Sequence, residues 1–241
     1  MQKTVRMRGK AGTLAGILHV PEGYPPFPGV QLCHGLASRK ENYADLAILL
    51  CEAGFVVLTL DCRGHGQSEG ALDDCPWQDA LTGLEYLQRR REVDGHRLAL
   101  AGASMGANHS LHAAVRVPEV RTVVAFNTAP NEVLRDALFS QPYWERIGLS
   151  TDRARICMPE YLQYLQRSEI YELPHRLSPR PLFFLHGRND EMVPFAVSEA
   201  LYAAAAPGSR LWVVDGCDHA GLRHDARVLP EVIQWLCEKL A

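Results

Sequence analysis

The pentapeptide Gly102-Ala103-Ser104-Met105-Gly106 carries the strongest chemical signal in this sequence. It follows a short apolar run at 97–101 and opens a segment with a helical pattern. In G-x-S-x-G, small residues flank the serine, so that a sharp strand-to-helix turn can expose its hydroxyl. The start of the helix also directs backbone N–H groups and the positive end of the helix dipole at an anion beside the serine. Ser104 is therefore predicted to be a nucleophile, with a chance match of the pentapeptide as the alternative.

A serine hydroxyl is a weak nucleophile unless a base accepts its proton and an acid orients that base. Asp190 and His219 follow Ser104 in the order Ser…Asp…His, each just after an apolar run, at 181–185 and 210–214. Asp215 and Asp218 are alternative partners for the histidine, although Asp218 adjoins it in the chain, so that its side chain is expected to point elsewhere. The sequence thus predicts a triad of Ser104, Asp190 and His219.

These residues need a parallel sheet to bring them together, because loops at the carboxyl ends of parallel strands share one edge. Short apolar runs that are nearly continuous are typical of strands buried on both faces. Helical patterns fill the gaps, and Asn42 is expected to cap a helix that ends at Gly54. The alternation predicts an α/β fold with a mostly parallel sheet of about eight strands. The expected strands lie near 4–8, 13–20, 29–33, 55–60, 97–101, 121–126, 181–185 and 210–214, and the helices near 42–53, 76–91, 105–116, 195–206 and 225–240.

One connection is too long for a simple crossover. About fifty residues separate the strand that ends near Asn127 from the strand that begins at Pro181, and the intervening chain is rich in aromatic residues. Residues 131–139 and 159–172 have helical patterns. We interpret 131–179 as a helical cap inserted into a single domain that spans 1–241. Trp144 is a candidate substrate-binding residue in this cap.

From about residue 13 to the C-terminus, the chain resembles the α/β-hydrolase family. The likeness rests on four stretches together with the glycine-flanked His219: His34-Gly35-Leu36, residues 61–68, the pentapeptide at 102–106, and residues 186–194. The resemblance implies an oxyanion hole formed by the backbone N–H groups of Leu36 and Met105. Ala103 stands where the family often has histidine, and this departure preserves the small-residue geometry.

Four other histidines have competing interpretations. His34 and His65 lie in stretches that resemble structural turns of the family, so a direct catalytic role is the less favoured reading. His109 and His112 are spaced to share a metal ion, but no carboxylate or cysteine accompanies them, which favours packed or exposed side chains. The glycines at 61–68 lack the Gly-Lys-Ser/Thr of a phosphate-binding loop. We therefore expect neither a metal nor a cofactor.

The composition is that of an ordinary globular protein, with 47% hydrophobic and 22% charged residues. The net charge is −3 and the charges are interspersed, so neither a nucleic-acid nor a membrane surface is predicted. The apolar stretch at 11–20 is short and broken by glycines, unlike a signal peptide. Seven scattered cysteines are expected to be reduced and mostly buried, which favours a cytoplasmic location.

The expected activity is hydrolysis of small to medium, hydrophobic or aromatic carboxylic esters through an acyl-enzyme. A thioesterase, an amidase or peptidase, or a carbon–carbon bond hydrolase would use similar residues. A haloalkane dehalogenase is disfavoured, because it needs a carboxylate in place of Ser104. A ligand-binding protein on the same fold is the alternative outside the enzymes, since a fold alone does not establish function. The sequence does not indicate whether the protein is a monomer or an oligomer.

Overall fold

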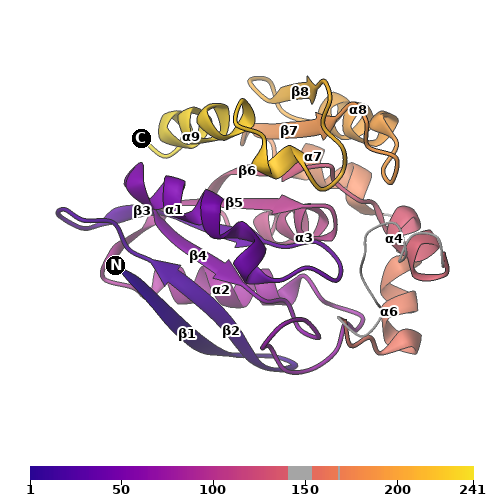
Figure 1. The fold of residues 1–241 in the computed structure, drawn as a ribbon, viewed down its shortest axis with the longest axis horizontal. Coiled ribbons are helices and arrows are strands. Elements are labelled where there is room, and N and C mark those ends of the chain that lie inside the picture. Colours follow the sequence, from indigo (N-terminus) through magenta and orange to yellow (C-terminus); the bar gives the residue numbers. More distant parts are fainter. Residues whose placement is uncertain (141–153, 168) are drawn as a thin grey trace.

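The computed structural model describes residues 1–140, 154–167 and 169–241. These residues form an eight-stranded sheet with the order β1-β2-β4-β3-β5-β6-β7-β8. The β1–β2 and β2–β4 pairs are antiparallel and the other pairs are parallel, which confirms the expected mostly parallel sheet (Figure 1). The strands are β1 (Gln2–Gly9), β2 (Gly12–His19), β3 (Phe27–Cys33), β4 (Val56–Leu60), β5 (Val93–Ala103), β6 (Val120–Phe126), β7 (Leu182–Gly187) and β8 (Arg210–Val214).

Helices cover both faces of this sheet. On one face α2 (Gln78–Gln88), α3 (Met105–Ala114) and α8 (Phe195–Ala203) share a core with alternate strand residues such as Leu98 and Leu100. On the other face α1 (Ala44–Glu52) and α9 (Val228–Lys239) pack against Ala99 and Ala101 of the same strand. Because successive side chains of a strand point to opposite faces, two cores favour apolar residues at successive positions. This explains the continuous apolar runs in the sequence.

Two local predictions were wrong. Asn42 lies inside the 3₁₀-helix η1 (Lys40–Tyr43) and α1 begins after it, so Asn42 does not cap α1. Its side-chain amide instead donates a 3.0 Å hydrogen bond to the Ser38 hydroxyl. Strand β8 is the edge of the sheet and is mostly half-buried, although its apolar residues suggested burial on both faces. An edge strand has a neighbour on one side only, which its own composition does not reveal.

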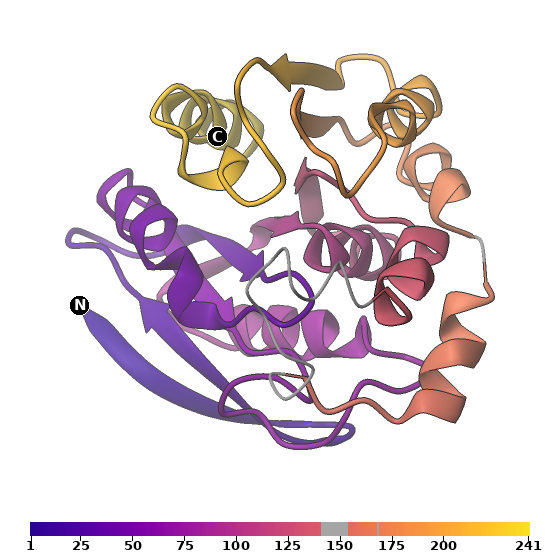
Figure 2. The same cartoon turned by 45° about the vertical axis from the view of Figure 1, so that its right-hand side comes forward.

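The long connection between β6 and β7 contains α4 (Asn131–Leu138), α6 (Met158–Leu165), the 3₁₀-helix η3 (Glu169–Glu172) and α7 (Leu173–Arg176). Helices α4 and α6 lie beyond the carboxyl ends of the central strands (Figures 1 and 2). Trp144, the candidate substrate contact, lies outside the described residues. No helix within the described ranges is both long enough and apolar enough to cross a membrane.

All seven cysteines are unpaired. Cys33, Cys62 and Cys217 are buried, Cys237 is exposed and the other three are half-buried. The expectation of mostly buried thiols was therefore too strong, because the helix surfaces and loops that carry the other four are only partly covered.

Candidate active site

Ser104 sits at the turn between β5 and α3, in a backbone conformation that L-residues rarely adopt (φ 56°, ψ −121°). Neighbouring strand ends hold it there: its N–H donates a 2.9 Å hydrogen bond to Phe126 O at the end of β6, and its carbonyl accepts one from Ala129 N–H. Only 7% of the residue is exposed. A strained conformation that its surroundings enforce is a common feature of functional sites.

The glycines on both sides of Ser104 make this turn possible. A Cβ on Gly102 would lie 2.8 Å from the backbone nitrogen of Ala107 in the first turn of α3. A Cβ on Gly106 would collide with the carbonyl oxygen of Cys33 and lie 2.6 Å from that of His34. Both contacts are with backbone, which cannot rotate away as a side chain can. Helix α3 can therefore approach β3 this closely only with glycine at 106.

We expect Gly106→Ala to destabilise the fold, because the added methyl would force α3 away from β3. Overpacking of this kind costs roughly 1–3 kcal/mol, and contact with rigid backbone favours the upper end of that range. Urea unfolding monitored by circular dichroism would measure the loss as a lower midpoint.

Gly95→Ala is the matched control for this prediction. Gly95 lies near the amino end of β5, the strand that precedes α3, and the atoms nearest to its added Cβ are 3.8 Å away, an ordinary contact distance. This variant should keep the wild-type midpoint or exceed it, because alanine restricts the unfolded chain. Equal midpoints for Gly106→Ala and wild type would show that the contact of α3 with β3 is not tight.

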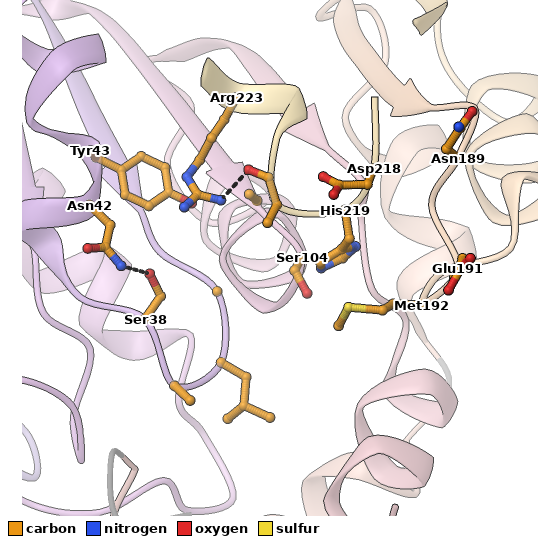
Figure 3. Close-up of a pocket in the computed structure, with 15 residues that line it drawn as sticks. Ser38, Asn42, Tyr43, Ser104, Asn189, Glu191, Met192, Asp218, His219 and Arg223 are labelled. Carbon is orange, nitrogen blue, oxygen red and sulfur yellow. Dashed lines mark hydrogen bonds between the residues drawn. The ribbon is translucent and has the colours of Figure 1, made fainter. Parts of the chain in front are cut away.

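His219 and Asp190 meet at the carboxyl ends of the last two strands. The imidazole Nδ1–H of His219, in the loop after β8, donates a 2.7 Å hydrogen bond to Asp190 Oδ2, in the loop after β7. Such a bond leaves Nε2 as the unprotonated acceptor of a neutral imidazole. Ser104 and His219 project into the same cavity (Figure 3). The structure thus brings together the three residues that the sequence singled out.

The Asp190 carboxylate is fully buried, and the hydrogen bonds that it accepts favour its charged form. Besides His219, it accepts hydrogen bonds from the backbone N–H groups of Met192 (2.8 Å) and Val193 (2.9 Å) through Oδ1. Burial raises the pKa of this carboxyl, but the hydrogen bonds from His219 and from the two N–H groups outweigh burial and hold the pKa below its usual value. Asp190 is therefore an ionised partner for the imidazole at neutral pH.

The two alternative acids point elsewhere. Asp215 forms an exposed ion pair with Arg188. Asp218 accepts a 2.6 Å hydrogen bond from Gly221 N–H and closes a turn in its own loop. Neither carboxylate is hydrogen-bonded to His219, so Asp190 alone among these three has the geometry to orient the base.

Two backbone N–H groups near Ser104 have no acceptor among the described residues. Within the described ranges, no hydrogen bond involves the N–H of Leu36, in the loop after β3, or that of Met105, the first residue of α3. Gly35 brings the first loop against the serine: a Cβ there would lie 3.4 Å from Ser104 Cβ and 3.3 Å from Ala103 O. Unpaired donors beside a nucleophile are the arrangement that stabilises an oxyanion.

His34 and His65 hold the loop that contains Leu36. His34 Nε2 accepts a hydrogen bond from Cys62 N–H (2.9 Å), and its Nδ1–H donates to Gly35 O (2.8 Å). His65 Nε2 accepts one from Ala37 N–H (3.0 Å). Burial lowers the pKa of both rings, that of His65 to about 3, so they stay neutral and can accept these bonds. The pair acts as a structural framework, as the resemblance implied.

His109 and His112 are buried, and within the residues that the structure describes neither ring nitrogen of either side chain has a hydrogen-bond partner. Burial lowers the pKa of both, that of His112 to about 4. His112 stacks on Trp77 with ring centroids 6.2 Å apart. In the part of the chain that the structure describes, no group of three His, Cys, Asp or Glu side chains could hold a metal ion.

A buried polar network connects α3 to the inserted helices. The Tyr164 hydroxyl on α6 donates a 2.7 Å hydrogen bond to Asn108 Oδ1 on α3. The Asn108 amide donates to Asn131 Oδ1 at the start of α4, and the Asn131 amide donates to Tyr164 O, both at 3.0 Å. Sequence reasoning missed this network, because asparagines within helical patterns normally indicate exposed positions. The closed ring of bonds fixes α4 and α6 to the helix that follows Ser104.

A cavity of about 640 Å³ opens above Ser104. Its lining comes from the loop after β3 (within 35–43), the serine turn (103–104), the loop after β7 (within 189–192) and the loop after β8 (within 218–223). The volume suits a small molecule. Among the described lining residues none comes from α4, α6 or α7, so the expectation that the insertion contributes to the pocket stays a prediction.

Sequence reasoning also missed Asn127 and Arg223. Asn127 directly follows β6, and its side chain donates to His219 O (3.0 Å) and accepts from Gly187 N–H (2.9 Å), so that it ties together the loops of the histidine and the acid. Its position just after a buried strand, at the same edge as the triad, was the available signal. Arg223 lines the cavity four residues after His219.

Comparison with known proteins places these features in context. A family model described as "Serine aminopeptidase, S33" matches residues 25–146. The putative esterase YitV of Bacillus subtilis is 29% identical over 189 residues, 73% of each chain. Esterase YjfP of Escherichia coli is 28% identical over 221 residues, 86% of each chain. Two Mycobacterium tuberculosis relatives are longer, and the match covers 63% of their length.

The crystal structure of the α/β hydrolase GrgF from Penicillium superposes with a TM-score of 0.84 at 18% identity, covering 100% of this chain and 99% of that one.

Proposed function

Because this chain belongs to the serine aminopeptidase S33 family of α/β-hydrolases, we propose that it is a serine hydrolase that cleaves carboxylic esters, with Ser104 as the nucleophile. The observation that carries the proposal is the convergence, in one cavity, of a strained serine and a histidine that is hydrogen-bonded to a buried carboxylate. The names of the curated relatives, esterase and putative esterase, support the ester as the substrate.

The first half of the proposed reaction forms an acyl-enzyme. His219 Nε2 takes the proton from Ser104 Oγ as the oxygen attacks the ester carbonyl carbon. The carbonyl π electrons move to the oxygen, and the N–H groups of Leu36 and Met105 bind the resulting oxyanion, each donor contributing roughly 3–4 kcal/mol. The intermediate then collapses as the bond to the alcohol oxygen breaks, and His219 returns the proton to that oxygen.

The second half releases the acid. Water enters in place of the alcohol, loses a proton to His219 and attacks the acyl carbon, and the bond to Ser104 breaks as the proton returns to the serine oxygen. Asp190 remains ionised throughout and holds Nδ1–H, so that Nε2 stays the acceptor. The proposal needs neither a metal nor an organic cofactor for any step.

The cavity supports small to medium substrates with an apolar part. Leu36, Ala37 and Met192 line it beside Ser104 and form an apolar surface for an acyl or aryl group. A volume of about 640 Å³ also limits the length of chain that fits.

A panel of para-nitrophenyl esters of rising acyl length, with matched thioesters and aryl amides, tests this function on the purified protein. We expect esters with short and medium acyl chains to be cleaved fastest and long chains to be poor substrates. Amides should be slower, because an amine is a worse leaving group than an alcohol.

Ser104→Ala protein from the same preparation serves as the blank for contaminating esterases. Turnover of aryl amides without turnover of esters would contradict the proposal and favour peptide or amide hydrolysis, which the description of the matching family model supports as the second candidate. No turnover of any member would instead favour a ligand-binding protein.

A further inference from the structure

Arg223 contributes a positive charge to the cavity that faces Ser104. Its guanidinium lies over the Tyr43 ring, with the guanidinium carbon 5.2 Å from the ring centroid, and Nη1 donates a 3.0 Å hydrogen bond to Ala220 O. These two contacts orient the side chain on one wall of the cavity (Figure 3). The arrangement is a fixed guanidinium rather than a freely moving surface arginine.

The charge of Arg223 is not neutralised by any carboxylate of the described residues. Within residues 1–140, 154–167 and 169–241, no carboxylate forms an ion pair with it, and only Nη1 has a hydrogen-bond acceptor. Its Nε is buried and has no hydrogen-bond partner in the described part of the chain. By contrast, Arg63, Arg188, Arg210 and Arg227 all pair with Asp or Glu. An arginine that is held in place but left unpaired can bind an anion at little additional cost in conformational entropy.

Polar neighbours extend this wall. The Ser38 hydroxyl accepts a hydrogen bond from the Asn42 amide, so its own proton remains available to a ligand. Ser38, Asn42 and Arg223 lie on the same side of the cavity as Tyr43 (Figure 3). The two lining carboxylates, Asp218 and Glu191, belong to the loops on the side of His219 and Met192 (Figure 3). The charge in the cavity is therefore asymmetric, with the cation on the wall of Ser38 and Asn42.

We propose that this wall binds a carboxylate on the substrate, remote from the ester that Ser104 attacks, with Arg223 as the residue that determines this specificity. The inference rests on the proposed esterase function and narrows its substrate class to half-esters of dicarboxylic acids and related acidic esters. Guanidinium is suited to the role because it is always charged and matches the planar geometry of a carboxylate. Leu36 and Ala37 line the same cavity and offer apolar surface to the chain that joins the two groups.

The test compares two substrates of equal length, mono-para-nitrophenyl adipate and para-nitrophenyl hexanoate, on wild type and Arg223→Gln. We expect the ratio of kcat/KM for the charged ester to kcat/KM for the neutral ester to fall about 10- to 100-fold in the variant, as a lost charge-assisted hydrogen bond implies. Arg223→Lys should recover part of the ratio, because it keeps the charge but not the planar fork.

Arg39→Gln is the charge-matched control. Arg39 adjoins the same wall in sequence, but its side chain is 65% exposed and does not line the cavity, so the ratio should stay within about twofold of wild type. If both substrates lose activity equally in Arg223→Gln, the residue only supports the loop through Ala220 and the inference is wrong.

A binding experiment separates this inference from the proposed function. Adipate should bind to Ser104→Ala protein in calorimetry, and Arg223→Gln in that background should raise its Kd at least tenfold. If adipate binding depends on Arg223 but wild type cleaves no ester, the anion site is supported and the esterase function is contradicted. Ester turnover with an unchanged substrate ratio and no adipate binding would retain the esterase and reject the anion site.

Discussion

Ser104→Ala is expected to abolish ester turnover and covalent labelling by a fluorophosphonate, while the fold remains intact. In the proposed mechanism the substitution removes the oxygen that forms the acyl bond, and the strained turn at 102–106 carries no other hydroxyl. Removing the nucleophile of a triad costs on the order of a million-fold in kcat, because the remaining members cannot act without it. Mass spectrometry of labelled wild-type protein should find one adduct per chain, on Ser104.

Ser110→Ala provides the matched control. Ser110 lies on the same helix, α3, and its buried hydroxyl donates a 2.7 Å hydrogen bond to Gly106 O, away from the cavity. Its loss should cost about 1 kcal/mol of stability, with labelling and turnover retained. An adduct on a different serine, together with activity in Ser104→Ala, would show that the nucleophile lies elsewhere.

Asp190→Asn should lower kcat about ten-thousand-fold without unfolding the protein. The side-chain oxygen of asparagine can still accept the two N–H groups of Met192 and Val193, so the amide nitrogen would take the place of Oδ2 opposite His219. Two N–H donors cannot share a hydrogen bond, and the imidazole would move its proton from Nδ1 to Nε2. In that tautomer Nε2 no longer accepts the proton of Ser104. Steady-state kinetics, with circular dichroism to check the fold, measure the effect.

Asp218→Asn separates the role of Asp190 from a general loss of negative charge near the histidine. Asp218 lies next to His219 in the chain, but its carboxylate oxygen accepts Gly221 N–H, which an asparagine oxygen can also accept. Its turnover should stay within about tenfold of wild type. A severe defect in Asp218→Asn with near-normal activity in Asp190→Asn would show that Asp218, and not Asp190, orients the histidine.

The sheet could be predicted from the sequence because burial on both faces leaves a direct trace in composition. Runs such as 123–126 and 182–185 contain only apolar residues, since alternate side chains enter the two cores. The position of a strand within the sheet leaves no such trace. The apolar residues of β8 resemble those of a central strand, although β8 lies at the edge. Asn42 likewise had the right residue type for a helix cap, but the preceding 3₁₀ turn displaced the start of α1.

The convergence of the three candidate-site residues could be predicted because each follows a strand of the sheet, and the topology then brings their loops to one edge. The residues that hold or extend the site could not. Asn127, Asn108 and Arg223 act through contacts with residues 21 to 180 positions away, in segments whose proximity depends on the whole fold. No local spacing distinguishes such an asparagine from one in a turn, or such an arginine from one at the surface.

The N–H groups of Leu36 and Met105, which have no acceptor among the described residues, belong to two parts of the molecule that are fixed by different contacts. The Leu36 loop is fixed to the chain after β4 by His34 and His65, whereas Met105 begins the helix that the asparagine network fixes to α4 and α6. The distance between the two N–H groups therefore depends on how these two parts pack against each other. The close approach of Gly35 to Ala103 and Ser104 determines that packing. In the proposed mechanism, a distortion of either part would weaken the hydrogen bonds to the tetrahedral intermediate and leave the hydrogen bond between His219 and Asp190 in place. The relative position of the Leu36 and Met105 N–H groups is thus a requirement separate from proton transfer by His219.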